Sequence, residues 1–272
     1  MPFKDVFRSD PEVAGENGTP EALLSALSTG PVGLGDRVGR TDPALVMATC
    51  RADGVLIKPD VPIAAVDASM LGAPAFASEL MVAECHSDHP AGRWSYVVGM
   101  HTNPSDDEVS GDIVFADLGD SAPKGDVIVW DWRARTATRA DPGTRWPVSL
   151  PKEGWAYLVL APILVAGQLT GGQVAAGQLA VIGDVSKFVS AGDARIVVES
   201  RGEVVRVTVK GAGETVDVTG WSTGPVTATT IDGGKSSPEF VVDRDPDTGL
   251  WALPVSVGSR GWATVELRAG ID

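Results

Sequence analysis

From about Leu71 to the C-terminus, apolar and polar residues alternate along a series of short runs. Successive side chains of a β-strand point to opposite faces, so this alternation is typical of strands with one buried face. QLTGGQVAAGQLAVIG is Gly-rich, and we interpret it as a loop that enters a strand. The pattern predicts an antiparallel β-sandwich of two packed sheets over residues 71–272, without a helical bundle. The clearest runs are DVIVWDW, ARIVVESRGEVVRVTVKG, ETVDVTGW, EFVVDRD and WATVELRAG.

The first 70 residues have a different pattern, in which helical and apolar extended segments alternate. GTPEALLSALSTG predicts a helix over 19–29 with Thr19 as its cap, and RTDPALVMATCRADG predicts a second helix capped by Asp42. PVGLG between them predicts a buried strand, and VLIKPDVPIAAVD predicts an extended segment whose prolines argue against a central strand. Helix alternating with apolar strand is typical of a parallel α/β sheet or barrel. We expect helices only within about 19–52.

Charge and composition exclude several classes of partner. The chain has 22 Lys and Arg against 36 Asp and Glu, a net charge of −14, which disfavours nucleic acid and anionic membranes. No run of apolar residues is long enough for a transmembrane helix, and no basic segment followed by an apolar one indicates a signal peptide. Two cysteines, Cys50 and Cys85, do not make a disulfide scaffold. These features predict a cytoplasmic protein.

The N-terminal segment resembles a known family of enzymes. GPVGLGDRVGRTDPALVMATCRADGVLIKPDVPIAAVD is similar to the end of the catalytic barrel in glycoside hydrolase family 36, within the group of raffinose synthases and seed-imbibition α-galactosidases. VWDWRARTATRADPGTRWPVSLPKEGWAYLVLAPI and LAVIGDVSKFVS are similar to the C-terminal β domain of that family. The features that carry the barrel resemblance are Gly30-Pro31, Asp36, Val38-Gly39, Leu45, Asp53-Gly54, Pro62 and Asp67.

The resemblance implies a fold and an activity. Residues 1–70 would be the last βα units of a (β/α)8 barrel, and residues 71–272 would be the β-sandwich that follows it, so that the chain is mainly β. A complete barrel needs roughly 200 residues or more. The resemblance therefore implies that the chain is the C-terminal fragment of an α-galactosidase-like retaining glycoside hydrolase, which acts on α-linked galactosides in carbohydrate metabolism.

The resemblance also implies catalytic and substrate-binding residues. Retaining glycosidases use two carboxylates about 5–5.5 Å apart, one as nucleophile and one as general acid/base. PFKDVFRS has the spacing of the family segment that carries the proposed acid/base, so Asp5 is the candidate catalytic residue, although Phe3-Lys4 replace the usual Asp-Trp pair. The sequence contains no counterpart of the nucleophile, so we expect the chain to be inactive alone.

Asp36 follows an apolar strand and precedes a Gly turn, which is where barrel active sites collect polar groups. We interpret Asp36, with Arg37 beside it, as a contact to sugar hydroxyls or a residue that shapes the site. The alternative is a turn Asp that caps its own loop.

Neither a metal nor a nucleotide cofactor is predicted. ECHSDHP contains Cys85, His86, Asp88 and His89 at a spacing that suits zinc, but no second paired cluster accompanies them. No G-x-G-x-x-G stretch precedes a suitable helix, and no G-x-S-x-G nucleophile elbow is present.

A second reading of the chain is a non-catalytic β-sandwich module that binds carbohydrate or packs against a partner. Eight tryptophans, seven of them after Trp94, could stack on sugar rings, but Trp130, Trp132 and Trp155 lie in apolar runs that favour a core role. Residues 1–70 would also lack strand neighbours on at least one side. We therefore expect self-association through this region, with docking onto the sandwich of the same chain as the alternative.

Overall fold

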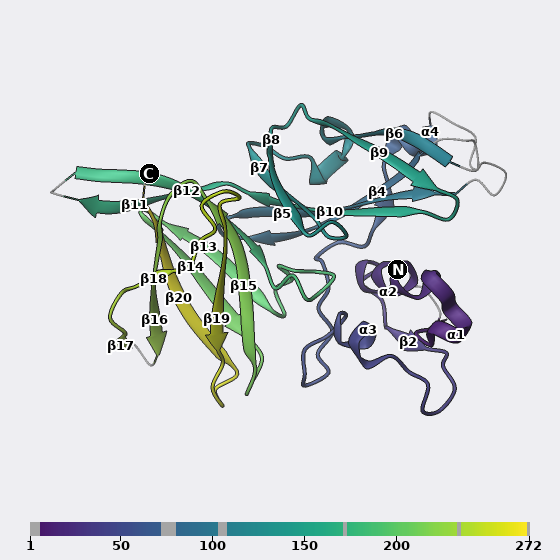
Figure 1. Cartoon of the computed structure of the whole chain (residues 1–272), viewed down its shortest axis with the longest axis horizontal. Coiled ribbons are helices and arrows are strands. Elements are labelled where there is room, and N and C mark those ends of the chain that lie inside the picture. The colour runs from purple at the N-terminus through teal and green to yellow at the C-terminus, as the bar shows by residue number, and fades with distance from the viewer. Residues whose placement is uncertain (1–5, 72–79, 103–107, 171–172, 233–234, 271–272) are drawn as a thin grey trace.

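The computed structural model describes residues 6–71, 80–102, 108–170, 173–232 and 235–270 (Figure 1). Antiparallel strands are the main secondary structure of the described residues and far outnumber the helices, so the prediction of a mainly β chain is confirmed. The chain forms a small N-terminal α/β region followed by two β units. None of the described helices is long and apolar enough to cross a membrane.

The α/β region is built on a short parallel pair of strands. β1 (Val6–Phe7) pairs with β2 (Gly33–Leu34), and the helices between them carry the chain back to the start of the second strand. Antiparallel neighbours need only a hairpin, whereas a parallel pair requires such a crossover. The elements that complete this region are α1 (Pro11–Ala14), the 3-10 helix η1 (Gly15–Asn17), α2 (Gly18–Leu27) and α3 (Pro43–Met47), after which β3 (Ala64–Ala65) and α4 (Asp67–Leu71) lead into the first β unit.

Two details of the predicted helices are wrong, and one is confirmed. The side chain of Asp42 accepts hydrogen bonds from the N–H groups of Ala44 and Leu45, so Asp42 caps α3 as predicted. Thr19 is not the cap of α2, because the preceding 3-10 turn lets the helix begin at Gly18. Helices also form outside 19–52, since α1 has its own Asp-Pro start signal and α4 follows the extended segment.

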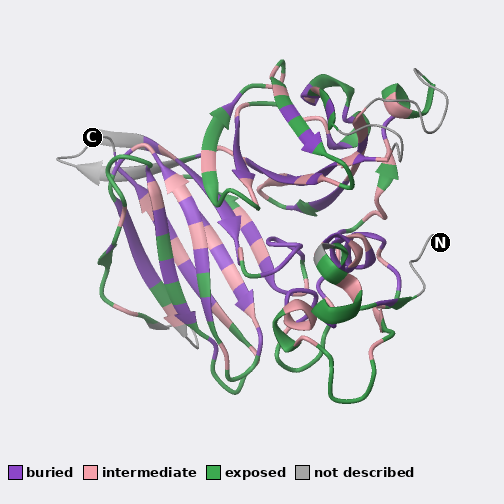
Figure 2. Ribbon diagram, turned by 45° about the vertical axis from the view of Figure 1, so that its right-hand side comes forward, coloured by how far each residue is buried: buried purple, intermediate pink, exposed green. Residues whose placement is uncertain are grey.

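The first β unit has a six-stranded sheet in the order β3-β4-β5-β10-β7-β8 and a smaller β6-β9 sheet against one of its faces. The strand β5 is buried continuously from Trp94 to Gly99, because its sheet is covered on both faces (Figure 2). The bounds are β4 (Leu80–His89), β5 (Gly92–His101), β6 (Glu108–Val114), the 3-10 helices η2 (Phe115–Asp117) and η3 (Gly119–Ser121), β7 (Val127–Asp131), β8 (Thr136–Ala140), β9 (Arg145–Pro151) and β10 (Trp155–Pro162).

The second β unit contains one four-stranded and one six-stranded antiparallel sheet, ordered β11-β12-β15-β19 and β13-β14-β20-β16-β17, with β18 paired to β16. A side chain at Gly220 in β15 would overlap the Trp251 ring opposite it, with a contact of 2.0 Å, so the indole occupies the space above this glycine. The bounds are β11 (Leu164–Thr170), β12 (Gln173–Gly183), β13 (Ile196–Arg201), β14 (Val204–Lys210), β15 (Thr215–Ser222), β16 (Val226–Asp232), β17 (Lys235–Ser236), β18 (Phe240–Val242), β19 (Leu250–Ser256) and β20 (Trp262–Ala269).

The predicted sandwich of two sheets over 71–272 is therefore too simple. The region holds two β units, and the Gly-rich segment interpreted as a loop is the hairpin of β11 and β12. One hydrophobic cluster lies inside the first unit, between its two sheets. The other cluster joins the opposite face of the six-stranded sheet to the second unit and to the α/β region, which explains why the apolar runs of β5 and β10 do not alternate.

Candidate functional site

The carboxyl ends of the parallel strands β1 and β2 bring together three acidic or hydroxyl side chains. Ser9 and Asp10 follow β1, and Asp36 follows β2. Parallel strands place their carboxyl ends at the same edge, so residues 27 positions apart in the chain become neighbours. Such an edge is where α/β barrels carry their active sites.

Asp36 organises this edge through its two carboxylate oxygens. One oxygen accepts the backbone N–H of Ser9 at 2.8 Å and that of Asp10 at 3.0 Å, and the other accepts the Ser9 hydroxyl at 2.5 Å. The Ser9 Oγ in turn accepts the N–H of Asp42 at the start of α3. Asp10 receives the Arg40 Nε at 3.1 Å, so a cation closes the cluster on the solvent side.

These hydrogen bonds set the charge of Asp36. The Ser9 hydroxyl is the largest cause of a pKa of Asp36 below its ordinary value. Burial opposes it as the second-largest effect, and the backbone N–H groups of Asp10 and Ser9 add to the lowering. A carboxyl group with a lowered pKa is a charged acceptor at neutral pH and is unsuited to donate a proton. The geometry thus fits Asp36 as a binding or shaping group, and it equally shows the loop-capping contacts of the alternative interpretation.

The structure says less about the other two predicted site residues, Arg37 and Asp5. Arg37 is exposed beside Asp36, and its carbonyl oxygen accepts the N–H of Arg40 in the turn that follows. Asp5, the candidate acid/base, lies outside the described residues, immediately before β1 in the sequence. The structure therefore places Asp36 with Ser9 and Asp10, a pairing that the sequence analysis did not identify.

We expect Asp36→Ala to lower the free energy of unfolding by about 1–3 kcal/mol at pH 7, because three donors lose their acceptor. A lowered folded pKa contributes stability that is present above the unfolded pKa and is lost as pH falls through the folded pKa. The wild type should therefore lose stability below about pH 4 more steeply than Asp36→Ala. Urea denaturation across this pH range measures both effects.

The matched control is Asp247→Ala, since Asp247 is exposed and its carboxylate has no hydrogen bond among the residues that the structure describes. This substitution should change stability by less than about 0.5 kcal/mol. Equal losses in the two variants would show that the Asp36 contacts do not stabilise the strand ends.

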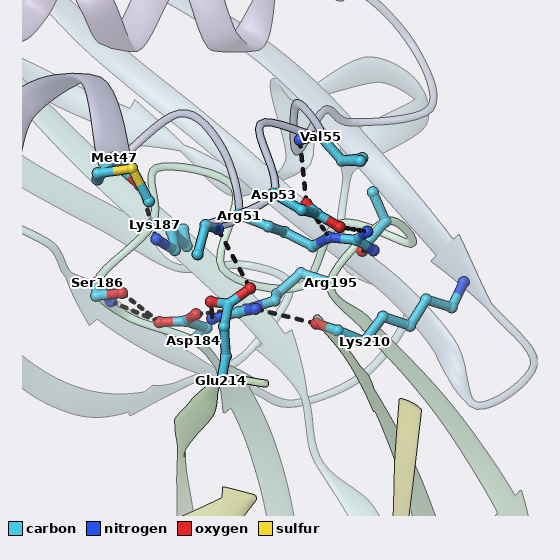
Figure 3. Close-up of polar contacts among 12 residues, drawn as sticks. Met47, Arg51, Asp53, Val55, Asp184, Ser186, Lys187, Arg195, Lys210 and Glu214 are labelled. Carbon is cyan, nitrogen blue, oxygen red and sulfur yellow. Dashed lines mark hydrogen bonds and ion pairs between the residues drawn. The ribbon is translucent and has the colours of Figure 1, made fainter. Parts of the chain in front are cut away.

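A second polar cluster joins the α/β region to the β units, and sequence reasoning missed it (Figure 3). Arg195 is 3% exposed and forms ion pairs with Asp184 at 2.7 Å and Glu214 at 2.9 Å, while its third nitrogen donates to the Lys210 carbonyl oxygen. A Glu214 oxygen also accepts the backbone N–H of Ala52. The cluster is therefore one continuous network that spans three segments far apart in the sequence.

Further contacts fix the same junction. The Lys187 ammonium donates to the Met47 carbonyl oxygen at 2.7 Å, and the Phe188 N–H donates to the Ala48 carbonyl oxygen at 2.9 Å. Arg51 pairs with Asp53 through two nitrogens, which raises the pKa of Arg51, and its remaining nitrogen donates to Ala194. The α/β region is thus docked onto the β units of the same chain through ion pairs and backbone hydrogen bonds.

The apolar face of α2 takes part in this docking. Leu23 and Leu27 are fully buried in the cluster that also contains Phe188 and Ile57.

The sequence did contain a signal for the polar cluster at this junction. In the LAVIGDVSKFVS stretch, two charged residues interrupt an otherwise apolar run. Buried charges are retained when they are paired, so Asp184 and Lys187 in such a run indicate specific partners elsewhere.

The predicted absence of a metal site concerned the ECHSDHP segment. These residues lie on β4, where Cys85 is fully buried, Asp88 is exposed and His89 Nε2 donates to the Ala191 carbonyl oxygen at 2.7 Å. His86 instead contacts the Ser121 hydroxyl at 3.0 Å. Within the described ranges, no three His, Cys, Asp or Glu side chains gather as metal ligands do.

No protein-family model matches the chain, and no curated protein is significantly similar to it.

Proposed function

We propose that the chain is the C-terminal portion of an α-galactosidase-like retaining glycoside hydrolase, with residues 1–70 as the last βα units of a (β/α)8 barrel. The observation that carries the proposal is the parallel pairing of β1 with β2 across a helical crossover, with Ser9, Asp10 and Asp36 at the shared carboxyl edge. Two adjacent βα units of a barrel have this connectivity and collect polar groups at this edge. A cytoplasmic location is part of the proposal.

The roles follow from the chemistry of the reaction. A retaining hydrolase needs an acid/base with a raised pKa and a carboxylate nucleophile. Asp5 is the candidate for the first role, and the nucleophile belongs to a preceding strand of the barrel. Asp36 has a lowered pKa, so its role is to accept hydrogen bonds from sugar hydroxyls or to hold the strand ends in register. Arg37 would add a donor at the same rim.

The test is to read the DNA upstream of the Met1 codon and to express the longer frame. We expect additional βα repeats with a strand-end Asp, and hydrolysis of an aryl α-galactoside with retention of configuration. The 272-residue chain alone should show negligible turnover, because removing a catalytic nucleophile costs several orders of magnitude. In the longer protein, Asp5→Asn should abolish turnover and Asp36→Asn should mainly raise KM.

Two results would contradict this proposal. The first is a stop codon directly upstream with no βα repeats, which would favour the non-catalytic module. The second is turnover by the 272-residue chain that disappears in Asp5→Asn, because the nucleophile would then lie within it.

Self-association through residues 1–70 remains a separate prediction. The docking of α2 covers its apolar face within the chain, but Leu34 on β2 and Val38 in the following turn are exposed. The net charge of −14 opposes the approach of two copies mostly at low salt, since charges beyond about 10 Å are screened at 0.1 M. We therefore expect association to strengthen with salt in analytical ultracentrifugation. A monomer at both low and high salt would leave only the docking within one chain.

A further inference from the structure

A cavity of about 580 Å³ opens at the boundary between the two β units. The first unit contributes the turn between β4 and β5, residues 122–127 and the end of β10, and the second unit contributes residues of β11 and β12. The volume is within the range of small-molecule sites, which is about 300–1,000 Å³, and such sites often lie between domains. The described residues that line the cavity all belong to the β units, so it is separate from the carboxyl edge of β1 and β2.

Part of the cavity wall is apolar and still reaches solvent. Ala122 and Pro123 follow η3, Pro162 ends β10 and Ile163 follows it, and all four are half-buried, so each has surface left to contact a ligand. Gly92 has a φ of 147°, a conformation that residues with a side chain rarely adopt, and a Cβ on it would lie 3.3 Å from the Pro162 ring. Glycine at this position therefore keeps the space beside Pro162 open.

The two carboxylates that line the cavity are already paired with arginines. Asp88 accepts from two nitrogens of Arg93, at 2.7 and 2.8 Å, and these contacts lower the pKa of Asp88. Asp126 accepts from two nitrogens of Arg139, at 3.1 and 2.6 Å. Hydrogen bonds between two charged groups are stronger than those between neutral groups. A cationic ligand would have to compete with both arginines, so the cavity is unsuited to one.

Two donors at the cavity have no acceptor among the described residues. Lys124 is exposed, and its ammonium forms no hydrogen bond or ion pair with them. Gln178 receives the remaining nitrogen of Arg139 at 3.0 Å, and because arginine can only donate, the atom that it contacts is the amide oxygen. Both N–H bonds of the Gln178 amide are then left to donate. The two donors are neighbours along the wall, since Arg139 joins Gln178 to Asp126, two residues after Lys124.

These groups select a monovalent anion with an apolar body. Lys124 is the lining cation that has no counter-ion among the described residues. A divalent anion such as phosphate would gain one ion pair, and its second charge would be repelled by Asp88 and Asp126. A carboxylate has two oxygens, which match one ammonium and one amide donor. The half-buried Pro123 and Ile163 favour a ligand whose carboxylate is attached to apolar carbon, because burying that carbon is favourable.

We propose that this cavity binds a small monocarboxylic acid with an apolar body. Its carboxylate accepts from Lys124 and Gln178, and its body lies against Pro123, Pro162 and Ile163. Because Lys124 belongs to the first β unit and Gln178 to the second, the site exists only in the folded chain, and the ligand stabilises the boundary between the units. The inference does not rest on the proposed hydrolase, since the described lining residues all belong to the β units.

The test uses the full 272-residue chain with two carboxylate probes, hexanoate and phenylacetate, and the neutral counterpart hexanamide. We expect at least one carboxylate to give saturable shifts of the backbone amide signals of Lys124, Gly125 and Gln178 in NMR titrations, with a Kd of about 1 mM or lower. Lys124→Gln removes the ammonium at an exposed position, so this variant should fold as the wild type does. Its Kd for the same carboxylate should rise at least about tenfold, because a charged donor is lost.

The matched control is Lys152→Gln, which makes the same change of charge at an exposed residue between β9 and β10, away from the lining of the cavity. Its affinity for the carboxylate should equal that of the wild type. Any of four outcomes overturns the proposal: no saturable shift with either carboxylate, equal affinity in Lys124→Gln, hexanamide binding as tightly as hexanoate, or inorganic phosphate binding more tightly than both carboxylates. Because binding and not turnover is measured, an inactive longer protein would leave this result unaffected.

Discussion

Arg195→Leu is expected to lower the free energy of unfolding by about 3–5 kcal/mol. Arg195 and Asp184 are each 3% exposed, and Glu214 is the second carboxylate on the same guanidinium. Removing the cation leaves two carboxylates buried close together with only hydroxyl and backbone donors to stabilise them. Breaking a buried pair is much more costly than its net contribution suggests, because the remaining charge keeps its full desolvation penalty. Urea denaturation at pH 7 measures the loss.

Arg201→Ala is the control for this effect. Arg201 also pairs with a glutamate, Glu199, but its side chain is 58% exposed, so the pair is solvated in both states. Exposed pairs contribute at most about 1 kcal/mol, and we expect a loss below that value. Similar losses in Arg195→Leu and Arg201→Ala would show that water reaches the Arg195 network.

The strands were largely predictable because their signal is local. In β14 and β15 every second residue is buried, β13 begins the same pattern at Ile196 and Val198, and the alternating runs in the sequence correspond to these strands within a few residues. The division into two β units was not predictable, because it depends on which sheets face each other. The relevant signal in the sequence was the long apolar run of β5 and of β10. A strand covered on both faces has such a run, and both strands are buried along most of their length.

The candidate site was predictable only in part, and for a physical reason. Asp36 could be identified because a polar residue between a strand and a Gly turn has a known place in α/β folds. Its partners Ser9 and Asp10 are 27 and 26 residues away, and nothing local in the sequence fixes the register of two-residue strands. The Arg195 network joins segments more than 140 residues apart at Arg51 and Ala194, so only the folded chain identifies it.

The sequence also left open what covers the α/β region, and the structure shows docking onto the β units. Phe7 and Ile57 share one hydrophobic cluster with Trp94 and with the second β unit. Contacts of this kind couple regions that composition would treat as separate, because burying apolar surface against a neighbour is favourable at about 25 cal/mol per Å². Unfolding of the whole chain should therefore be more cooperative than its division into regions suggests.

Trp94→Ala is the second change with a large expected effect, a loss of about 3–5 kcal/mol in the free energy of unfolding. Trp94 lies on β5 of the first β unit and is fully buried. Its indole N–H donates to the Val181 carbonyl oxygen on β12 of the second unit at 2.7 Å, and its ring meets the His89 ring edge-on at 4.8 Å. The substitution leaves a cavity at this boundary and a carbonyl oxygen without its donor.

Trp262→Ala separates this boundary effect from the general loss of an indole. Trp262 is 48% exposed on β20, so truncating it removes little buried contact, and we expect a loss of about 1 kcal/mol or less. The wild type should unfold in one transition, with coincident curves from tryptophan fluorescence and far-ultraviolet circular dichroism. Separate transitions in the wild type would mean that the two β units fold independently. A loss in Trp94→Ala no larger than in Trp262→Ala would mean that the boundary around Trp94 repacks without cost.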